Sequence, residues 1–381
     1  MYYIVDESTN DILYAPNMQN DLKYNLIDPT WTEEINKAGS LEFTIYPTHQ
    51  LYDKYKKMTT IFAVKDEDDK INWRGRVLND TKDFYNAKQV YCEGQLAFFN
   101  DSIIRPYNLK NYTLEKFFNY LLAEHNRQVE SRKQFVVGSV DLGYKTNFVT
   151  ENYEYRSTLT ELQELLDTYG GYILFEGDRI YYSSISGDIS NQPIQFGVNM
   201  LNYTEAVEAS DICTVLIPLG VQKEKADGTT PEDPLTIKSV NGGKDYLENQ
   251  NGIKAFGRIV QAVTFDDVNV AQTLKTVGIQ YLSKLFQQAT SITVTAADLF
   301  DLGLDVDRIR CGNYHQIFSA PHGIDNYYQC TKIVHHLEDP MSSEYTFGST
   351  QYSLSDQAAK DSKIMFKLTS ALKLNKVKTI I

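Results

Sequence analysis

Residues 291–296 of this chain read SITVTA, and residues 41–46 read LEFTIY. In each segment apolar and polar side chains alternate with a period of two, which predicts a β-strand with one buried face. Each strand opens a longer stretch of similar make-up. These stretches, residues 41–94 and 291–348, span 54 and 58 residues.

The two stretches continue in the same order. After a polar connection comes a second apolar run, IFAV at residues 61–64 and QIFSA at residues 316–320, and then a turn. A long strand and a closing strand follow, and the closing strand ends in Gly94 or Gly348. This order predicts one small β-barrel used twice. Because the copies lack identical residues at matching positions, a chance recurrence of β-meanders is the alternative.

The composition is that of a folded globular protein. A chain of 381 residues is long enough for about two to three domains with cores of their own. Hydrophobic residues make up 42% and charged residues 23%, which are ordinary values. The 27 tyrosines favour many strands and wide contact surfaces.

The charge disfavours a protein that reads nucleic acid. The net charge is −13, whereas a nucleic-acid-binding surface is basic. From Ser355 onward six lysines stand against two aspartates, so this end carries +4 and the rest carries −17. A solvated helix face is the plainest interpretation of that basic end, and a lipid or nucleic-acid site is the alternative.

The sequence also indicates the compartment. No window of about 18 apolar residues occurs, so we expect no membrane-spanning segment. Residues 1–6, MYYIVD, lack the charged and apolar regions of a signal peptide, so we expect folding in a cytoplasm. The four cysteines have no close pairs, which favours reduced, mostly buried thiols over a disulfide framework. They are Cys92, Cys213, Cys311 and Cys330.

Other segments predict further elements. Residues 2–5 and 12–15 flank a polar turn and predict a first hairpin, and residues 24–27 and 30–35 predict two more strands. Leucines and phenylalanines at i, i+3, i+4, i+7 and i+8 predict an amphipathic helix over residues 112–127 with Thr113 as its N-cap.

A second helix is expected behind a cap at Ser157 or Thr158, ended by Gly170 and Gly171. Residues 172–175 and 179–183 predict a hairpin that covers this helix. The remaining predictions are a strand at 214–220, an exposed loop at 223–234, strands at 235–240 and 246–247, and a third helix at 268–287 with Asp266 or Asp267 near its cap.

The predicted fold class is α+β and mainly β. We expect a first β-barrel domain (1–104), an α+β domain (105–205), a second β-barrel domain (206–247 and 291–350), a helical insert (248–290) and a C-terminal lysine-rich helix (351–381). The apolar stripe of the last helix is too narrow for a core, so this helix should dock on a partner or on a copy of itself.

No catalytic, cofactor-binding or metal-binding residue is predicted. The histidines are not in zinc-site spacing, and His335 and His336 must face opposite ways on a strand. Acidic clusters at 66–69 and 298–307 suit solvated turns and helix caps, although calcium binding and paired-carboxylate chemistry are alternatives. The other histidines are His49, His125, His315 and His322, and the second acidic cluster comprises Asp298, Asp301, Asp305 and Asp307.

From residue 197 onward the order of short motifs resembles one family. The motifs include GVNML at 197–201, IPLG at 217–220, VTAADL at 294–299 and CGN at 311–313, with GSLEFTI at 39–45 near the start. This order is similar to the tail-associated hub proteins of long-tailed phages (siphophages) of Gram-positive bacteria, which share a fold with the baseplate hub of contractile tails. The resemblance covers residues 1–350.

The resemblance implies a structural role and no cofactor. Three chains, each with two similar barrels, would form a ring that closes a six-fold tail tube at the baseplate and opens for DNA ejection. The implied partners are a homotrimer, the distal tail protein, receptor-binding or adhesion proteins, and the tail tube or tape-measure protein. DNA would pass without specific binding, and an acidic wall would not hold it. The implied location is the virion tail tip, after assembly in the bacterial cytoplasm.

Two other functions stay open. Some longer members of this family carry a peptidoglycan-cleaving domain, but only about thirty residues follow Gly348, too few for a hydrolase core, so we expect no enzyme activity. A cell-wall hydrolase acting at entry is the first alternative. A β-module that binds host glycans, suggested by the tyrosines, is the second.

Overall fold

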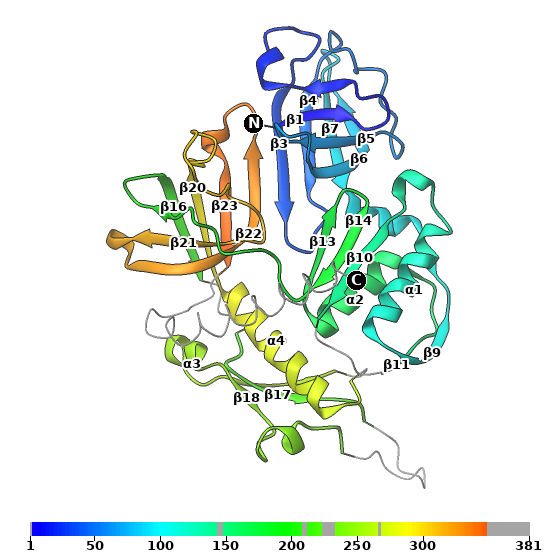
Figure 1. Cartoon of the computed structure of the whole chain (residues 1–381), viewed down its shortest axis with the longest axis vertical. Coiled ribbons are helices and arrows are strands. Elements are labelled where there is room, and N and C mark those ends of the chain that lie inside the picture. The colour runs from blue at the N-terminus through cyan, green and yellow to red at the C-terminus, as the bar shows by residue number, and fades with distance from the viewer. Residues whose placement is uncertain (1, 143–147, 208–211, 223–232, 266–267, 349–381) are drawn as a thin grey trace, which may run out of the picture.

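The computed structural model describes residues 2–142, 148–207, 212–222, 233–265 and 268–348. Figure 1 shows two β regions side by side, an α+β domain beside them, and a small sheet with a long helix below. The predicted C-terminal helix at 351–381, most of the predicted loop at 223–234, and Asp266 and Asp267 lie outside the described residues.

The first β region is an antiparallel sheet with the order β3-β4-β7-β6-β5-β1-β2. Trp31, Leu41, Phe62 and Val77 form part of its core. The predicted hairpin of β1 and β2 is confirmed. The strand expected at 30–35 is confirmed within β3, which has a bulge between Ile27 and Thr30. The separate strand expected at 24–27 is wrong, because residues 24–26 precede β3 and form no strand. The strands are β1 (Tyr3–Asp6), β2 (Ile12–Tyr14), β3 (Ile27–Glu34), β4 (Ser40–Ile45), β5 (Ile61–Lys65), β6 (Ile71–Lys82) and β7 (Lys88–Gly94).

The second β region has the order β16-β20-β23-β22-β21-β15 and a separate core. Ile292, Val294 and Phe347 lie in that core, as the alternation in SITVTA predicts. Short 3₁₀ turns follow β21 and β22. The elements are β15 (Ile194–Gln195), β16 (Met200–Val207), β20 (Thr290–Ala296), β21 (Tyr314–Ser319), η5 (Ala320–His322), β22 (Ile324–His336), η6 (Pro340–Ser342) and β23 (Glu344–Gly348).

The two regions repeat one strand order. Strands β3, β4, β7, β6 and β5 follow one another as β16, β20, β23, β22 and β21 do. The long strands β6 and β22 are both bulged against the closing strand, immediately after Val77 and after Cys330. The predicted class, α+β and mainly β, is confirmed. The two small β-barrels expected from the sequence are two similar modules and not separate closed barrels. The modules share one open, curled sheet, because β22 also pairs with β3.

The α+β domain follows the first β region and begins with a buried 3₁₀ turn, η2 (Gln95–Asp101). Its main sheet has the order β10-β14-β13, and two further strand pairs flank it. The elements are β8 (Ile103–Ile104), β9 (Tyr107–Tyr112), α1 (Leu114–Asn126), η3 (Ser131–Lys133), β10 (Val136–Asp141), β11 (Phe148–Asn152), β12 (Arg156–Ser157), α2 (Thr158–Tyr169), β13 (Tyr172–Glu176) and β14 (Arg179–Ser183).

Side-chain caps fix the residues at which α1 and α2 begin, as predicted. The Thr113 side chain accepts a hydrogen bond from the backbone NH of Lys116, and the Ser157 side chain accepts one from Thr160. Each cap satisfies an amide that has no partner inside the helix. Gly170 ends α2 with φ of 67°, a left-handed value that glycine adopts without strain.

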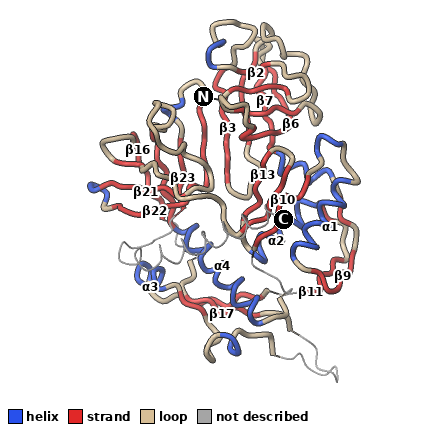
Figure 2. Tube along the Cα trace, in the orientation of Figure 1, coloured by secondary structure: helices blue, strands red, loops and turns tan. Residues whose placement is uncertain are grey.

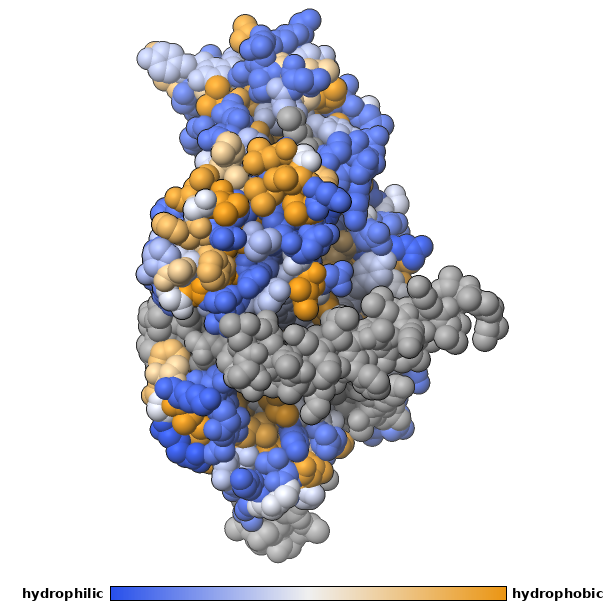
Figure 3. All heavy atoms as spheres, turned by 60° about the vertical axis from the view of Figure 1, so that its left-hand side comes forward, coloured by the Kyte–Doolittle hydropathy of each residue, from blue (hydrophilic) through white to orange (hydrophobic). Residues whose placement is uncertain are grey.

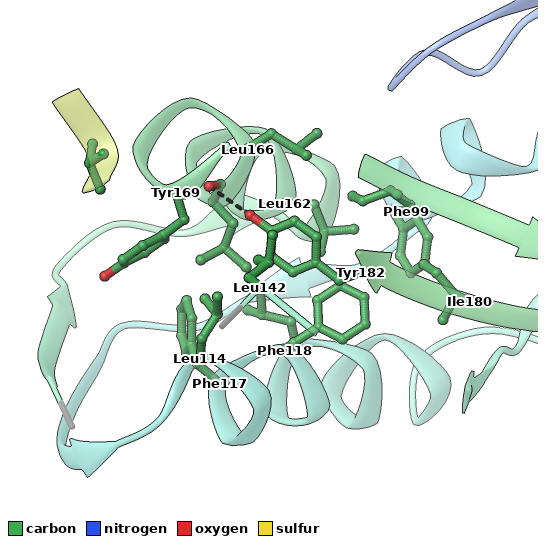
Figure 4. Close-up of a cluster of buried hydrophobic side chains, with 14 of the residues drawn as sticks. Phe99, Leu114, Phe117, Phe118, Leu142, Leu162, Leu166, Tyr169, Ile180 and Tyr182 are labelled. Atoms are coloured by element: carbon green, nitrogen blue, oxygen red, sulfur yellow. Dashed lines mark hydrogen bonds between the residues drawn. The ribbon is translucent and has the colours of Figure 1, made fainter. Parts of the chain in front are cut away.

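The core of this domain lies between the helices and the hairpin. Figure 4 shows Phe118 of α1 and Leu162 of α2 directed toward Tyr182 of β14. The buried Tyr182 hydroxyl donates to the carbonyl oxygens of Leu165, at 3.0 Å, or Gly170, at 2.7 Å. The predicted hairpin at 172–183 therefore covers α2, with its one buried hydroxyl satisfied.

Residues between β16 and β20 form a separate three-stranded sheet, ordered β18-β17-β19, with α4 packed on it (Figure 2). Leu274 and Val277 of α4 lie in the same core as the α+β domain. The elements are β17 (Val215–Leu219), η4 (Lys238–Val240), β18 (Leu247–Glu248), α3 (Gln250–Phe256), β19 (Val260–Thr264) and α4 (Ala271–Ala289).

Two sequence predictions need correction here. The sequence predicts that the strand at 214–220 belongs to the second β-barrel, but β17 pairs only with β18 and β19 among the described strands. A strand at 235–240 was expected, but 238–240 form the 3₁₀ turn η4. Leu235 makes backbone bonds to Gly220 and Val221, and the chain then turns away to bury Ile237.

Candidate assembly surfaces

The seam between the two β regions is a run of backbone hydrogen bonds. Strand β22 pairs antiparallel with β3, from Lys332 opposite Glu34 to His336 opposite Thr30. The pairing is extended at its end, where Leu337 NH donates to the Pro29 carbonyl at 3.1 Å. The two β regions are therefore joined as neighbouring strands of one sheet.

Aromatic side chains pack over this seam. The Trp31 and His335 rings stack, with centroids 4.2 Å apart and planes 15° apart. Tyr2 packs edge-on against both rings. His335 Nε2 lies 2.9 Å from Glu33 Oε1, so strands from both regions hold the histidine in place.

Arg308 connects the same two regions on one side of the seam. Its guanidinium contacts Asp301 at 2.8 Å and Glu67, on a hairpin turn of the first region, at 3.1 Å. The guanidinium carbon lies 4.9 Å from the centre of the Tyr2 ring. Arg308 is 5% exposed, so its charge is compensated by partners from both regions.

A cavity of about 500 Å³ opens beside this cluster. Tyr14, Leu302 and Met341 give it apolar walls, and Asp298 also lines it. Burial raises the pKa of Asp298, whose oxygens accept hydrogen bonds from the backbone amides of Phe300 and Ile309. These bonds give the carboxylate a role in shaping the loop.

A second buried ion-pair cluster joins the first β region to the α+β domain. Arg76 of β6 pairs with Glu93 at 2.7 Å and also with Asp101, which Lys133 contacts at 2.7 Å. Burial opposes the charge on Asp101, but hydrogen bonds and charge from Lys133 and Arg76 hold its pKa below the usual value. The guanidinium of Arg76 is therefore an anchor between two domains.

Most of the histidines considered in the sequence analysis are buried in the structure, and three of them contact backbone carbonyls. Burial lowers the pKa of His49, His125 and His315. Each has a ring nitrogen within hydrogen-bonding distance of a backbone carbonyl, at 2.9 Å, 3.0 Å and 3.1 Å respectively. His335 and His336 lie on β22 as expected, the first buried and the second partly exposed.

Among the described residues two serine–histidine contacts occur, and neither has an accessible nucleophile. Ser102 Oγ lies 2.7 Å from His125 Nδ1, and Ser319 Oγ lies 2.6 Å from His322 Nδ1. Nucleophilic catalysis requires a serine oxygen that a substrate can reach. Ser102 and Ser319 are only 1% and 0% exposed.

The acidic clusters form turns. Asp66 accepts hydrogen bonds from the amides of Asp68 and Lys70 and from Asn72, and these bonds outweigh burial and lower its pKa. Asp307 and Asn191 exchange hydrogen bonds of 2.9 Å and 2.6 Å. Within the described residues no group of histidine, cysteine and acidic side chains is arranged to hold a metal ion.

The cysteines are unpaired thiols in the structure. Burial raises the pKa of Cys92 and Cys330. None of the helices in the described ranges is long and apolar enough to cross a membrane.

Three solved structures with a similar fold are tail proteins, and two of them come from prophages. The prophage tail protein gp18 from Listeria monocytogenes EGD-e is 16% identical, with a TM-score of 0.58 over 96% of this chain and 99% of that chain. A tail protein from Neisseria meningitidis MC58 is 10% identical, with a TM-score of 0.63 over 92% and 96%. The 43 kDa tail protein of prophage MuSo2 from Shewanella oneidensis is also 10% identical, with a TM-score of 0.63 over 91% and 97%.

The sequence gives a second, independent match. Residues 188–358 match the model of a family described as Prophage endopeptidase tail. No curated protein matches the chain. The resemblance to phage tail proteins that the short motifs indicate is confirmed, by the family match over residues 188–358 and by the fold over nearly the whole chain.

Proposed function

We propose that this chain is the structural hub at the distal end of a phage tail, where three copies form a ring that closes the tail tube. The observation that carries the proposal is the repeated strand order of the two β regions. A trimer offers six like surfaces to a six-fold tube only if each chain repeats its module. The tail-protein fold supports the same role.

The hub anchors neighbouring tail parts and opens for DNA ejection. Its partners are the distal tail protein, the receptor-binding or adhesion proteins, and the tail tube or tape-measure protein. The net charge of −13 suits a passage through which DNA moves without binding, because like charges repel. This role places the protein in the tail tip of the virion.

The mass of the purified protein in solution tests the proposal. Light scattering coupled to size exclusion should give a mass near three times 43.6 kDa, increasingly populated as concentration rises. A stable dimer in solution would contradict the ring. A protein that stays monomeric at every concentration in solution, and is also present as a single copy in the assembled tail, would contradict it too.

The family description names an endopeptidase, which favours one other function for this chain, the cleavage of cell-wall peptides. Two buried serine–histidine contacts are the nearest approach to a nucleophile among the described side chains, and neither reaches the surface. We therefore expect no clearing when the purified chain is run in a gel containing cell walls. Clearing would overturn the non-enzymatic role.

A further inference from the structure

The two β regions can be superimposed in register through one backbone feature. Val77 NH donates to the carbonyl of Thr60, just before β5, and Cys330 NH donates to the carbonyl of Asn313, just before β21. Val77 lies opposite Cys92 of the closing strand, and Cys330 lies opposite Phe347. The bulge follows both residues directly, so Val77 and Cys330 are equivalent positions.

Counting residues from the equivalent positions Val77 and Cys330 shows which residues correspond at the ends of β6 and β22. Asn79 pairs with Tyr91 after the first bulge, and Lys332 pairs with Thr346 after the second. The stretch from Asn79 to Lys82 in β6 is therefore equivalent to the stretch from Lys332 to His335 in β22. In β22 this stretch pairs with β3 on its second edge. In β6 no strand of the described residues pairs with that edge.

Strand β3, which pairs with the end of β22, has an equivalent strand in the second β region. Strand β3 pairs with β4, with Trp31 opposite Leu41, as β16 pairs with β20, with Glu205 opposite Ile292. Leu41 and Ile292 are equivalent because they face Cys92 and Phe347 of the closing strands. β16 therefore occupies the place of β3, and it is the last strand at its end of the described sheet.

We propose that the end of β6 in one protomer pairs antiparallel with β16 of the next protomer, in the register that sets Lys82 opposite Glu205. This seam rests on the proposed trimer and specifies its contact. It reproduces between chains the pairing of β22 with β3, in which His335 lies opposite Trp31. In three chains, internal and intermolecular seams then alternate around one ring.

The chemistry of the two edges is complementary in this register. Lys82 and Glu205 are both exposed and opposite in charge, so they attract each other when placed opposite one another. An unpaired strand edge of a soluble protein is expected either to pair with another strand or to carry charged side chains that prevent such pairing. Beyond Lys82 the β6 hairpin carries Phe84 and Tyr85, which are 92% and 78% exposed. Antiparallel pairing directs these rings toward the residues that precede Glu205, where Leu201 is 56% exposed.

The positions of the edges suit a closed ring. Figures 1 and 2 show β16 at the outer side of the second β region and β6 at the opposite outer side of the first. Such a head-to-tail contact closes into a ring when the rotation between neighbours allows it. Figure 3 shows apolar side chains gathered on the side of the second β region, where Phe196, Val198 and Leu201 are exposed.

Charge reversal tests the register. The variants Lys82→Glu and Glu205→Lys should each shift the trimer dissociation midpoint to higher concentration by about 5-fold or more, and the double variant should restore it. Lys254→Glu, on the exposed side of α3, is the matched control and should change nothing. Equal midpoints in wild-type and single variants would overturn the seam.

Cysteine cross-linking separates the seam from the trimer itself. The full chain carrying Lys82→Cys and Glu205→Cys should form covalent dimers and trimers under mild oxidation, and either single variant should not. A native trimer whose double variant gives no covalent species would refute this seam and leave the ring intact. Neither cross-linking nor self-association at any concentration would refute both.

Discussion

The two β regions share a strand order and differ in what surrounds it. In the first, a short turn joins β3 to β4, whereas in the second the three-stranded sheet and α4 lie between β16 and β20. The outer neighbour of β5 is the antiparallel β1, and that of β21 is the short, parallel β15. The module tolerates an insertion in a loop because its alternating apolar faces set the pairing, and its edges vary.

The largest expected effect concerns how each module is anchored. Arg76 and Gln329 are equivalent, since each directly precedes the matched pair Val77 and Cys330. Arg76→Ala should lower the free energy of unfolding by about 3–5 kcal/mol, because Glu93 loses its buried counter-charge and Asp101 keeps only Lys133. Denaturant unfolding followed by far-UV circular dichroism measures this loss.

Gln329→Ala should cost less, about 1–3 kcal/mol. Gln329 also reaches the chain outside its own module, through Ser186 and through the Tyr172 hydroxyl at 3.2 Å, but these partners are neutral. The same unfolding experiment compares the two variants. A larger loss of unfolding free energy for Gln329→Ala than for Arg76→Ala would contradict the prediction that the charged residue stabilises its module more than the neutral one.

The third expected effect is on pH dependence. Burial depresses the pKa of His49 in the first region and of His315 in the second, so the unfolded chain binds protons that the folded chain excludes. Their stabilisation is complete well above the ordinary pKa of 6.5 and is lost as pH falls toward the lowered pKa, by at most about 1.4 kcal/mol per pH unit for each histidine.

The first region supplies a control variant for this test. Phe62 is equivalent to His315, since each is the second residue of its strand after the matched backbone bond. His315→Phe should therefore flatten the fall in the free energy of unfolding between pH 7 and pH 5. A wild-type stability that is constant or rises over this range would contradict the assignment.

Local patterns predicted most elements and could not predict which distant strands meet. Alternation in LEFTIY and SITVTA and the caps at Thr113 and Ser157 act within a few residues, so the sequence displays them. The pairing of β22 with β3 joins segments about 300 residues apart and has no local signal. The buried run VLIPL at 215–219 shows burial and not the sheet to which it belongs, which explains the misplaced strand β17.

The buried arginines that join the domains could not be predicted from the sequence either. The pairing of Arg76 and Arg308 with distant carboxylates has no local signal, although a charged residue inside an apolar strand, such as Arg76 in WRGRVL, indicates a buried ion pair. The predicted domain boundaries treated 248–290 as an insert and gave 206–247 to the second barrel. We propose instead that the described residues between 212 and 289 form one unit with the α+β domain, since the two share a core.

The central claim is that one chain carries two equivalent modules so that three chains build a ring of six. Class averages of the purified assembly by electron microscopy test it most directly. The account predicts a ring with three-fold symmetry in which six similar densities alternate in pairs around a central opening. Two-fold particles, or open filaments of any length, would contradict it.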